Sequence, residues 1–104
     1  MGARLLRVKD WEAVAREARF QPAAAAAKCS VSLRQFERFF AQNFHKPPGV
    51  WMRQVRCKIA KDLIAKGWTN KAVVKELGFG NDSHLCHEFQ QFYGCAPQSY
   101  APPQ

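Results

Sequence analysis

The chain carries the same pattern twice: a short apolar segment, a tight turn, and a longer segment with one apolar and one polar face. The longer segments span residues 32–44 and 82–93. Each begins at a residue type that caps helices, Ser32 in the first and Asn81 or Asp82 in the second. Because apolar residues recur at helical spacing in both repeats, we predict an all-α protein of about seven helices.

Three helices are predicted around the first repeat. Residues 10–20 place apolar side chains at helical spacing, and Pro22 ends this helix but suits the first turn of the next one. That next helix is an alanine tract, and alanine is the strongest helix former. The helix that starts at Ser32 turns one apolar face inward, formed by Leu33, Phe36, Phe39, Phe40 and Phe44. The opposite, polar face carries Arg34, Glu37, Arg38 and Ala41.

A long basic helix is predicted after the first repeat. Apolar residues keep helical spacing from Trp51 to Leu63, and Gly67 then permits a left-handed stop. The outward positions of this helix include Arg53, Lys58, Lys61 and Lys66. The chain is therefore predicted to divide into a first subdomain, a linker helix and a second subdomain, over residues 1–46, 47–67 and 68–104.

The second repeat is predicted to pack like the first. Thr69 caps a short helix, Gly78 makes the turn, and Phe79 returns to the core. The inward side chains of the two helices are Val73, Val74, Leu77, Leu85, Phe89 and Phe92. The outer face of the second helix carries Ser83, Cys86, His87 and Gln90, and Gly94 ends it.

The charge of the chain favours a polyanionic partner. Sixteen Lys and Arg stand against eight Asp and Glu, which gives a formal net charge of +8. Cationic side chains that neutralise phosphates release counterions, and this release drives binding. Residues 1–66 hold 14 basic and 5 acidic side chains, whereas residues 67–104 hold 2 basic and 3 acidic ones. The first two thirds of the chain are therefore expected to hold phosphates most strongly.

The stretch LGFGNDSHLCHEFQQFYGCAPQSY resembles the C-terminal signature of the AraC/XylS family of transcriptional regulators. The matching positions there are Gly78, Phe79, Ser83, His84, Leu85, Phe89, Gly94, Pro97 and Tyr100. The first repeat and the helix after it are similar to the family at Ser32, Phe36, Arg38, Phe40, Pro48, Trp51, Met52, Arg56 and Ala60. The chain departs from the family at Ser30 and His45, where glycine is usual, and at His87 and Ala101, where arginine is common.

The resemblance covers residues 10–101 and implies two helix-turn-helix subdomains joined by a linker helix. It further implies sequence-specific binding of double-stranded DNA and regulation of transcription, with both recognition helices in successive major grooves on one side of the duplex. RNA polymerase is a further candidate partner, and one copy of the chain is expected to act as a monomer. Without glycine, the turns at Ser30 and His45 must be made by residues that tolerate positive φ less well.

Two sets of DNA contacts are expected. An arginine fork matches the two acceptors of guanine, and a carboxylate accepts from cytosine N4. Base contacts are therefore expected from the outer faces, at Arg34, Glu37, Arg38, Ser83, Cys86 and His87. Phosphate contacts, which supply affinity without choosing sequence, are expected from Lys28, Ser32, Lys46, Arg53, Lys58, Lys71 and His84.

Cysteine and histidine raise two chemical alternatives. His84, Cys86, His87 and Cys95 are close in sequence, but no second pair of residues has the spacing of zinc ligands. No cysteine is accompanied by the glycine-rich loop or the orienting acid that a Cys/His hydrolase requires. We therefore expect no metal, no cofactor and no enzymatic activity.

The four cysteines form no C-x-x-C pair, and the N-terminus lacks the apolar core of a signal peptide. We therefore expect free thiols in a cytoplasmic protein. No apolar run approaches the roughly 20 residues that cross a bilayer, so no membrane partner is expected.

A protein-interaction module is the alternative function. In this interpretation a helix-turn-helix domain binds a regulator or RNA polymerase and has weak or no affinity for DNA, and the weak charge of residues 67–104 favours it. Affinity for duplex DNA that falls steeply with salt distinguishes a DNA-binding protein from such a module. The sequence leaves open whether the chain stands alone or belongs to a larger regulator.

Overall fold

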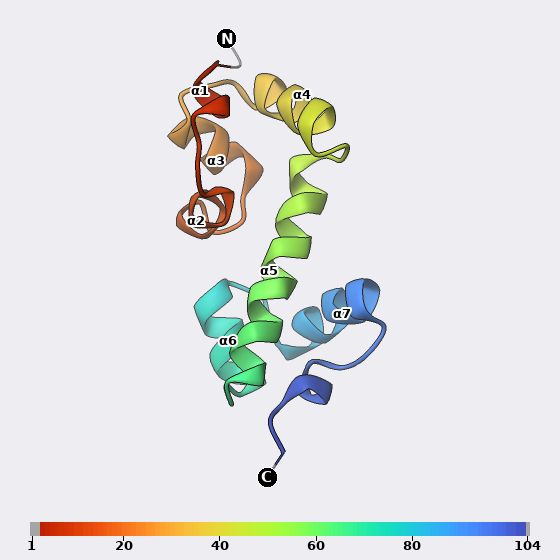
Figure 1. Cartoon of the computed structure of the whole chain (residues 1–104). Helices are drawn as coiled ribbons and strands as arrows, with labels where there is room; N and C mark the ends of the chain where they lie inside the picture. Colours follow the sequence, from red (N-terminus) through yellow and green to blue (C-terminus); the bar gives the residue numbers. More distant parts are fainter. Residues whose placement is uncertain (1–2, 104) are drawn as a thin grey trace. The chain divides into compact units, whose positions relative to one another are not determined.

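Helices account for all the regular structure in residues 3–103, which are the residues that the computed structural model describes. Figure 1 shows their order along the chain. The α-helices are α1 (Ala3–Leu6), α2 (Trp11–Glu17), α3 (Pro22–Lys28), α4 (Leu33–Asn43), α5 (Pro48–Ala65), α6 (Asn70–Leu77) and α7 (Asp82–Tyr93). A single 3₁₀ turn, η1 (Pro97–Tyr100), follows them. The predicted all-α class is confirmed.

The chain forms two compact units, and the boundary between them falls inside α5, between Arg53 and Gln54. The first unit contains α1 to α4 and the start of α5, and the second contains the rest of α5, α6, α7 and η1. Each unit therefore holds one of the two repeated patterns, α3–α4 in the first and α6–α7 in the second.

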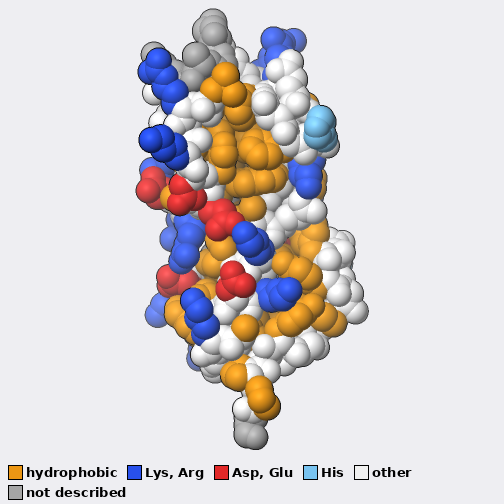
Figure 2. Space-filling view, in the orientation of Figure 1, with side chains coloured by type: hydrophobic (Ala, Val, Ile, Leu, Met, Phe, Trp, Pro, Cys, Tyr) orange, Lys and Arg blue, Asp and Glu red, His pale blue; other side chains and the backbone are white. Residues whose placement is uncertain are grey.

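Aromatic rings form most of the core of the first unit. The Trp11 ring of α2 meets the Phe36 and Phe40 rings of α4 edge to face, with centroids 5.9 and 5.2 Å apart. Phe40 also stacks on Phe44 at 4.7 Å and meets Trp51 of α5 at 5.3 Å. Such pairs add about 0.5 to 1.5 kcal/mol each beyond the area they bury. Figure 2 shows hydrophobic side chains gathered in the upper part of the view, where this unit is drawn.

Helix α3 packs against α2 and α4 through small side chains. Ala25 and Ala26 are buried, and an alanine lets a neighbouring backbone approach closely. Pro22 occupies the first turn of α3, as predicted, because a proline there lacks only an N–H that has no helical partner in any case.

Helix α2 is shorter than predicted, because it ends at Glu17 and not near residue 20. Arg19 and Phe20 adopt φ angles of 53° and 61°. Their N–H groups donate to the carbonyls of Arg16 and Ala15, which closes the helix in a left-handed cap. Phe20 is nevertheless buried. The apolar pattern that predicted this helix therefore extends past the end of α2, to a residue that is buried but not helical.

The turns that lack glycine adopt the expected left-handed conformation. Ser30 has a φ of 59°, its N–H donates to the carbonyl of Ala27, and the N–H of Val31 donates to that of Ala26. His45, which follows α4, also has a φ of 59°. The prediction that residues other than glycine must make these two turns at positive φ is thus confirmed.

Leu33 is the one member of the predicted apolar face of α4 that lies in the open, at 41% exposure. It is the first residue of α4, directly after the cap Ser32. A helical side chain leans toward the preceding turn, and at the first position there is no preceding turn to cover it. The prediction that Leu33 faces the core was therefore wrong.

The second unit is built around apolar side chains from α5, α6 and α7. The buried residues include Ile59, Ile64, Val73, Leu77, Phe79, Leu85 and Phe89. Thr69 caps α6 as predicted, and Asn81, not Asp82, caps α7 by accepting from the N–H of His84 at 2.8 Å. Gly67, Gly78 and Gly94 all have positive φ angles at the helix ends where glycine was expected.

Lys61 does not point freely outward as predicted. Its side chain is half-buried, and its Nζ lies over the rings of Tyr93 and Tyr100, 5.1 and 4.7 Å from their centroids. An ammonium group is attracted to the negative face of an aromatic ring, which explains why this lysine turns toward α7 and η1.

Candidate nucleic-acid interface

The α4 helix presents a polar ridge opposite its buried face. Phe36 and Phe40 are fully buried, and this fixes the rotation of the helix about its axis. The polar ridge is formed by Arg34, Glu37, Arg38 and Ala41, and all four residues are exposed. The predicted base-reading residues of the first unit therefore share one accessible face.

The start of α4 is held in place by a capping box. The Ser32 hydroxyl accepts from the Gln35 N–H at 3.1 Å, and the Gln35 side chain accepts from the Ser32 N–H at 3.0 Å. Each of these bonds satisfies a backbone donor that the first turn would leave without a partner. The first turn of α4, which carries Arg34, is thus held by local hydrogen bonds.

The charged members of the polar ridge have no partner within residues 3–103. The side chains of Arg34, Glu37 and Arg38 form no hydrogen bond or ion pair with any residue that the structure describes. Charged side chains on a protein surface often pair with a neighbour, as Lys28 does with Glu17 at 3.9 Å. The donors of Arg34 and Arg38 and the acceptors of Glu37 are therefore available to an outside ligand.

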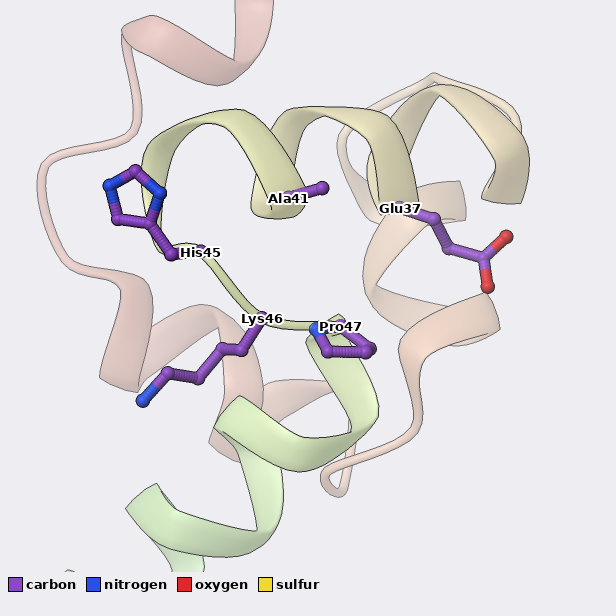
Figure 3. A pocket seen from close by; sticks show the side chains of 5 residues that line it. All are labelled: Glu37, Ala41, His45, Lys46 and Pro47. Carbon is purple, nitrogen blue, oxygen red and sulfur yellow. The ribbon is translucent and has the colours of Figure 1, made fainter.

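A surface hollow lies where α4 ends and the chain turns into α5. It has a volume of about 530 Å³ and is lined by Glu37, Ala41, His45, Lys46 and Pro47. Figure 3 shows Glu37 and Lys46 extending in different directions from its rim. The hollow thus joins one predicted base contact to one predicted phosphate contact.

Other predicted phosphate-binding residues are spread over both units. In the first unit Lys28 ends α3 and Arg53 lies on α5, and both are exposed, while Lys46 is half-buried. In the second unit Lys58 and Lys71 are exposed on α5 and α6. Among these residues, the first unit holds more of the cationic side chains.

The outer face of α7 carries no Asp, Glu, Lys or Arg. Ser83, His87 and Gln90 are exposed, and Cys86 is half-buried. The His87 ring lies 3.3 Å from the Gln91 amide one turn away. Compared with α4, this face offers neutral hydrogen-bonding groups and fewer long side chains.

His84 faces the protein and not the outer surface of α7. Its Nδ1 accepts from the Gly80 N–H at 3.1 Å, and its Nε2 lies 3.2 Å from the Glu88 carboxylate. Because Nδ1 accepts, the hydrogen of the neutral ring is on Nε2 and donates to Glu88. Both ring nitrogens are engaged within the second unit, so a phosphate contact by His84 would require one of these bonds to break.

A buried ion pair that the sequence pattern did not predict anchors α7. Glu88 accepts from the Arg56 guanidinium at 2.9 Å, both side chains are buried, and Arg56 also lies 4.3 Å from the centre of the Phe79 ring. A signal was present, because Glu88 occupies the apolar stripe between Leu85 and Phe89. A carboxylate on an inward stripe requires a partner, and Arg56 is on the inward side of α5.

The four cysteines are free thiols in environments of different polarity. Cys57 is fully buried, and burial, assisted by the negative charge of Glu88 and opposed by Arg56, raises the pKa of its thiol to about 12. Within residues 3–103, no group of three His, Cys, Asp or Glu side chains is arranged to hold a metal ion. None of the helices in this range is long and apolar enough to cross a membrane.

Comparison with known proteins assigns the pattern to a family. The sequence model of a protein family described as a helix-turn-helix domain matches residues 25–102 of the chain. This range covers α4 to α7 and most of α3. The chain belongs to the AraC-type helix-turn-helix family.

Two curated relatives match the chain. It is 30% identical to the regulatory protein PocR of Salmonella typhimurium over 67 residues, which are 60% of this chain and 22% of PocR. It is 28% identical to an uncharacterised HTH-type transcriptional regulator of Haemophilus influenzae over 76 residues, which are 72% of this chain and 26% of that protein. The chain thus spans about a quarter of either relative. No solved structure matches it significantly.

Proposed function

We propose that the chain binds double-stranded DNA in a sequence-specific manner and regulates transcription, with α4 and α7 as its recognition helices. The observation that carries the proposal is the polar ridge of α4, whose charged side chains have no partner among the described residues. Membership of the AraC-type family and the names of the two relatives support the same activity.

The α4 helix supplies the charged base contacts. Arg34 and Arg38 are one helical turn apart on the polar ridge, and each can present two donors to the O6 and N7 acceptors of a guanine. Glu37 lies between them in the sequence and can accept from cytosine N4. The first unit is therefore expected to prefer a site that contains G·C pairs.

The α7 helix supplies neutral contacts. Ser83, Cys86 and His87 can bond to base edges, but they offer shorter reach and less charge than arginine. His84 acts as a positioning residue in this unit, because its two ring bonds join the turn at Gly80 to α7. The second unit is expected to add less sequence preference than the first.

Affinity comes from phosphate contacts on both units. Exposed cations and the N–H groups at a helix start attract phosphates. The residues proposed for this role are Lys28, Ser32, Lys46, Arg53, Lys58 and Lys71. One copy of the chain carries both units, so it can bind an asymmetric site as a monomer.

Titration of labelled duplex DNA tests the function. We expect affinity for random duplexes to fall steeply between 50 and 200 mM salt, by about 10³-fold or more if six phosphates are contacted. Selection from a random duplex pool then gives the preferred site. Arg38→Ala should weaken binding to that site by about 1 to 3 kcal/mol and relax the preference at one position.

Arg7→Ala is the matched control, because it removes the same charge from an exposed position outside α3 and α4. It should leave the selected sequence unchanged. If Arg38→Ala binds every sequence as the wild type does, α4 is not the recognition helix.

A protein-interaction module is the second candidate, and the observation that favours it is the outer face of α7, which carries no Asp, Glu, Lys or Arg. Such a module would bind duplex DNA weakly at every salt concentration. The titration therefore separates the two functions directly.

A further inference from the structure

Leu33 is an apolar side chain exposed at the start of the proposed recognition helix. Within residues 3–103, the large hydrophobic side chains with high exposure are Leu6, Leu33 and Trp68. A single exposed leucine requires no explanation by itself. The position of Leu33 is informative, because it immediately precedes Arg34 and lies one helical turn before Glu37.

Leu33 lines a mostly apolar hollow that also holds one acidic and one basic side chain. Leu33 and Glu37 line one hollow of about 430 Å³, and Arg53 of α5 lines it as well. Prolines at the N-terminal starts of α3 and α5 also line this hollow. Leu33 is thus bordered by a proposed base contact on its own helix and by a proposed phosphate contact on the next.

The major groove offers few partners to such a side chain. The first residues of a recognition helix are the ones that approach base edges. The edges of adenine, guanine and cytosine present polar groups there, whereas thymine presents its C5-methyl group. Contact with that methyl group removes apolar surface from water on both sides.

We propose that Leu33 recognises the C5-methyl group of a thymine next to the base pairs that Arg34 and Glu37 contact. The inference rests on the proposed function and adds a specificity residue to it. The capping box supports it, because the bonds between Ser32 and Gln35 fix the backbone on which Leu33 stands. A protein side chain in the same hollow is the competing occupant. Arg53 lines the hollow and the exposed Arg34 directly follows Leu33 in the chain, and these two cations favour a polyanion although Glu37 in the lining opposes it.

Replacement of thymine by deoxyuridine tests the proposal, because uracil differs only by the missing methyl group. The site selected from the random pool is synthesised with one thymine at a time replaced, and dissociation constants are measured for each duplex. For the wild type, we expect one replacement to weaken binding about fourfold, the ratio that corresponds to burial of one methyl group.

Leu33→Ala should bind the thymine and uracil duplexes equally, because the group that senses the methyl is gone. The exposed first position of a helix tolerates alanine, so the variant should fold. Leu6→Ala is the control, since it removes an exposed leucine outside α4 and should keep the fourfold difference.

Three results would overturn the proposal. The first is a wild type that is insensitive to every replacement. The second is a Leu33→Ala variant that retains the full difference, and the third is a Leu33→Ala variant that loses only the response to added RNA polymerase in a transcription assay. The last result would assign the hollow to a protein partner. In all three cases salt-dependent binding to the selected site still supports the proposed function, whereas absence of that binding removes both.

Discussion

At the scale of single residues, the placement of α7 depends on two charges enclosed by the second unit. Arg56 and Glu88 are 7% and 6% exposed, and their side chains meet at 2.9 Å. Removing two charges from water costs several kcal/mol, so the pair contributes less to net stability than its short distance suggests. The ion pair nevertheless helps to place α7 against α5. Glu88 also contacts His84, and His84 in turn accepts from the N–H of Gly80 in the preceding turn.

Loss of one member of this pair should destabilise the second unit. Glu88→Ala leaves the Arg56 guanidinium buried without its carboxylate, and we expect the free energy of unfolding to fall by about 3 to 5 kcal/mol. The double variant Arg56→Met with Glu88→Leu should recover most of that loss, because apolar side chains of similar size fill the space. Urea unfolding followed by circular dichroism measures both, and a single variant as stable as the double one would contradict the expectation.

The Cys57 thiol predicts a loss of stability at alkaline pH. In the fold its pKa is raised from the ordinary 9.0 to about 12, chiefly by burial. Between these values the unfolded chain releases the proton and the folded chain keeps it, so the unfolded state is favoured as pH rises. The free energy of unfolding should decline between pH 9 and 12, with a slope that approaches about 1.4 kcal/mol per pH unit.

Cys57→Ala isolates this effect from the other groups that titrate at high pH, such as Tyr93, whose pKa burial also raises. The variant should be less stable at pH 7 and should lose stability less steeply above pH 9. Equal slopes in the variant and the wild type would show that the thiol does not titrate in this way.

At the scale of elements, the ends of helices were easier to predict from the sequence than the side-chain contacts between helices. The caps Ser32 and Thr69 and the stop at Gly78 depend on a few neighbouring residues, so the sequence indicates them directly. The polar ridge of α4 was equally predictable, because it is the face left over once the phenylalanines are buried.

Other features depend on packing that periodicity does not contain. Phe20 is buried although it lies after the end of α2, so its apolar character extended the predicted helix too far. The exposure of Leu33 depends on the absence of a preceding turn. The contacts of His84 depend on where the turn places the Gly80 N–H, and spacing along the chain does not give that position.

Glycine should increase stability at the two turns where another residue holds a left-handed conformation. Ser30 and His45 hold left-handed conformations that cost a residue with a Cβ atom about 1 to 2 kcal/mol. Glycine avoids this strain but loses more entropy on folding, so we expect Ser30→Gly and His45→Gly each to add about 0.5 to 1 kcal/mol. Thermal unfolding of the variants provides the measurement.

Gly94→Ala and Gly80→Ala are the paired controls. At Gly94 a Cβ atom meets nothing within 4 Å, but the φ of 70° makes alanine strained, so a loss of about 1 kcal/mol is expected. At Gly80 the nearest atom to a new Cβ is His84 Nδ1, at an ordinary 3.7 Å, and φ is not positive. If both alanine variants change the free energy of unfolding equally, the left-handed backbone at Gly94 is not the cause of the loss.

At the scale of the whole molecule, the uneven charge raises the question of whether both units hold DNA. Residues 67–104 contain only Lys71 and Lys75 as basic side chains. Net charge gives the sign of the partner, but the dependence of affinity on salt counts the phosphates that are contacted. Single substitutions in the second unit therefore decide whether it takes part.

Lys71 and Lys75 form a matched pair for this measurement. Both are exposed on α6, but Lys71 is in the first turn, where helix N–H groups favour an anion, and Lys75 is in the last turn. If the second unit holds the duplex through the start of α6, Lys71→Ala should reduce the slope of log affinity against log salt by about one, and Lys75→Ala should leave it unchanged. Both variants lose the same charge, so a general electrostatic effect would lower the two slopes alike. A slope that Arg53→Ala reduces and Lys71→Ala does not would mean that the first unit alone engages the phosphates.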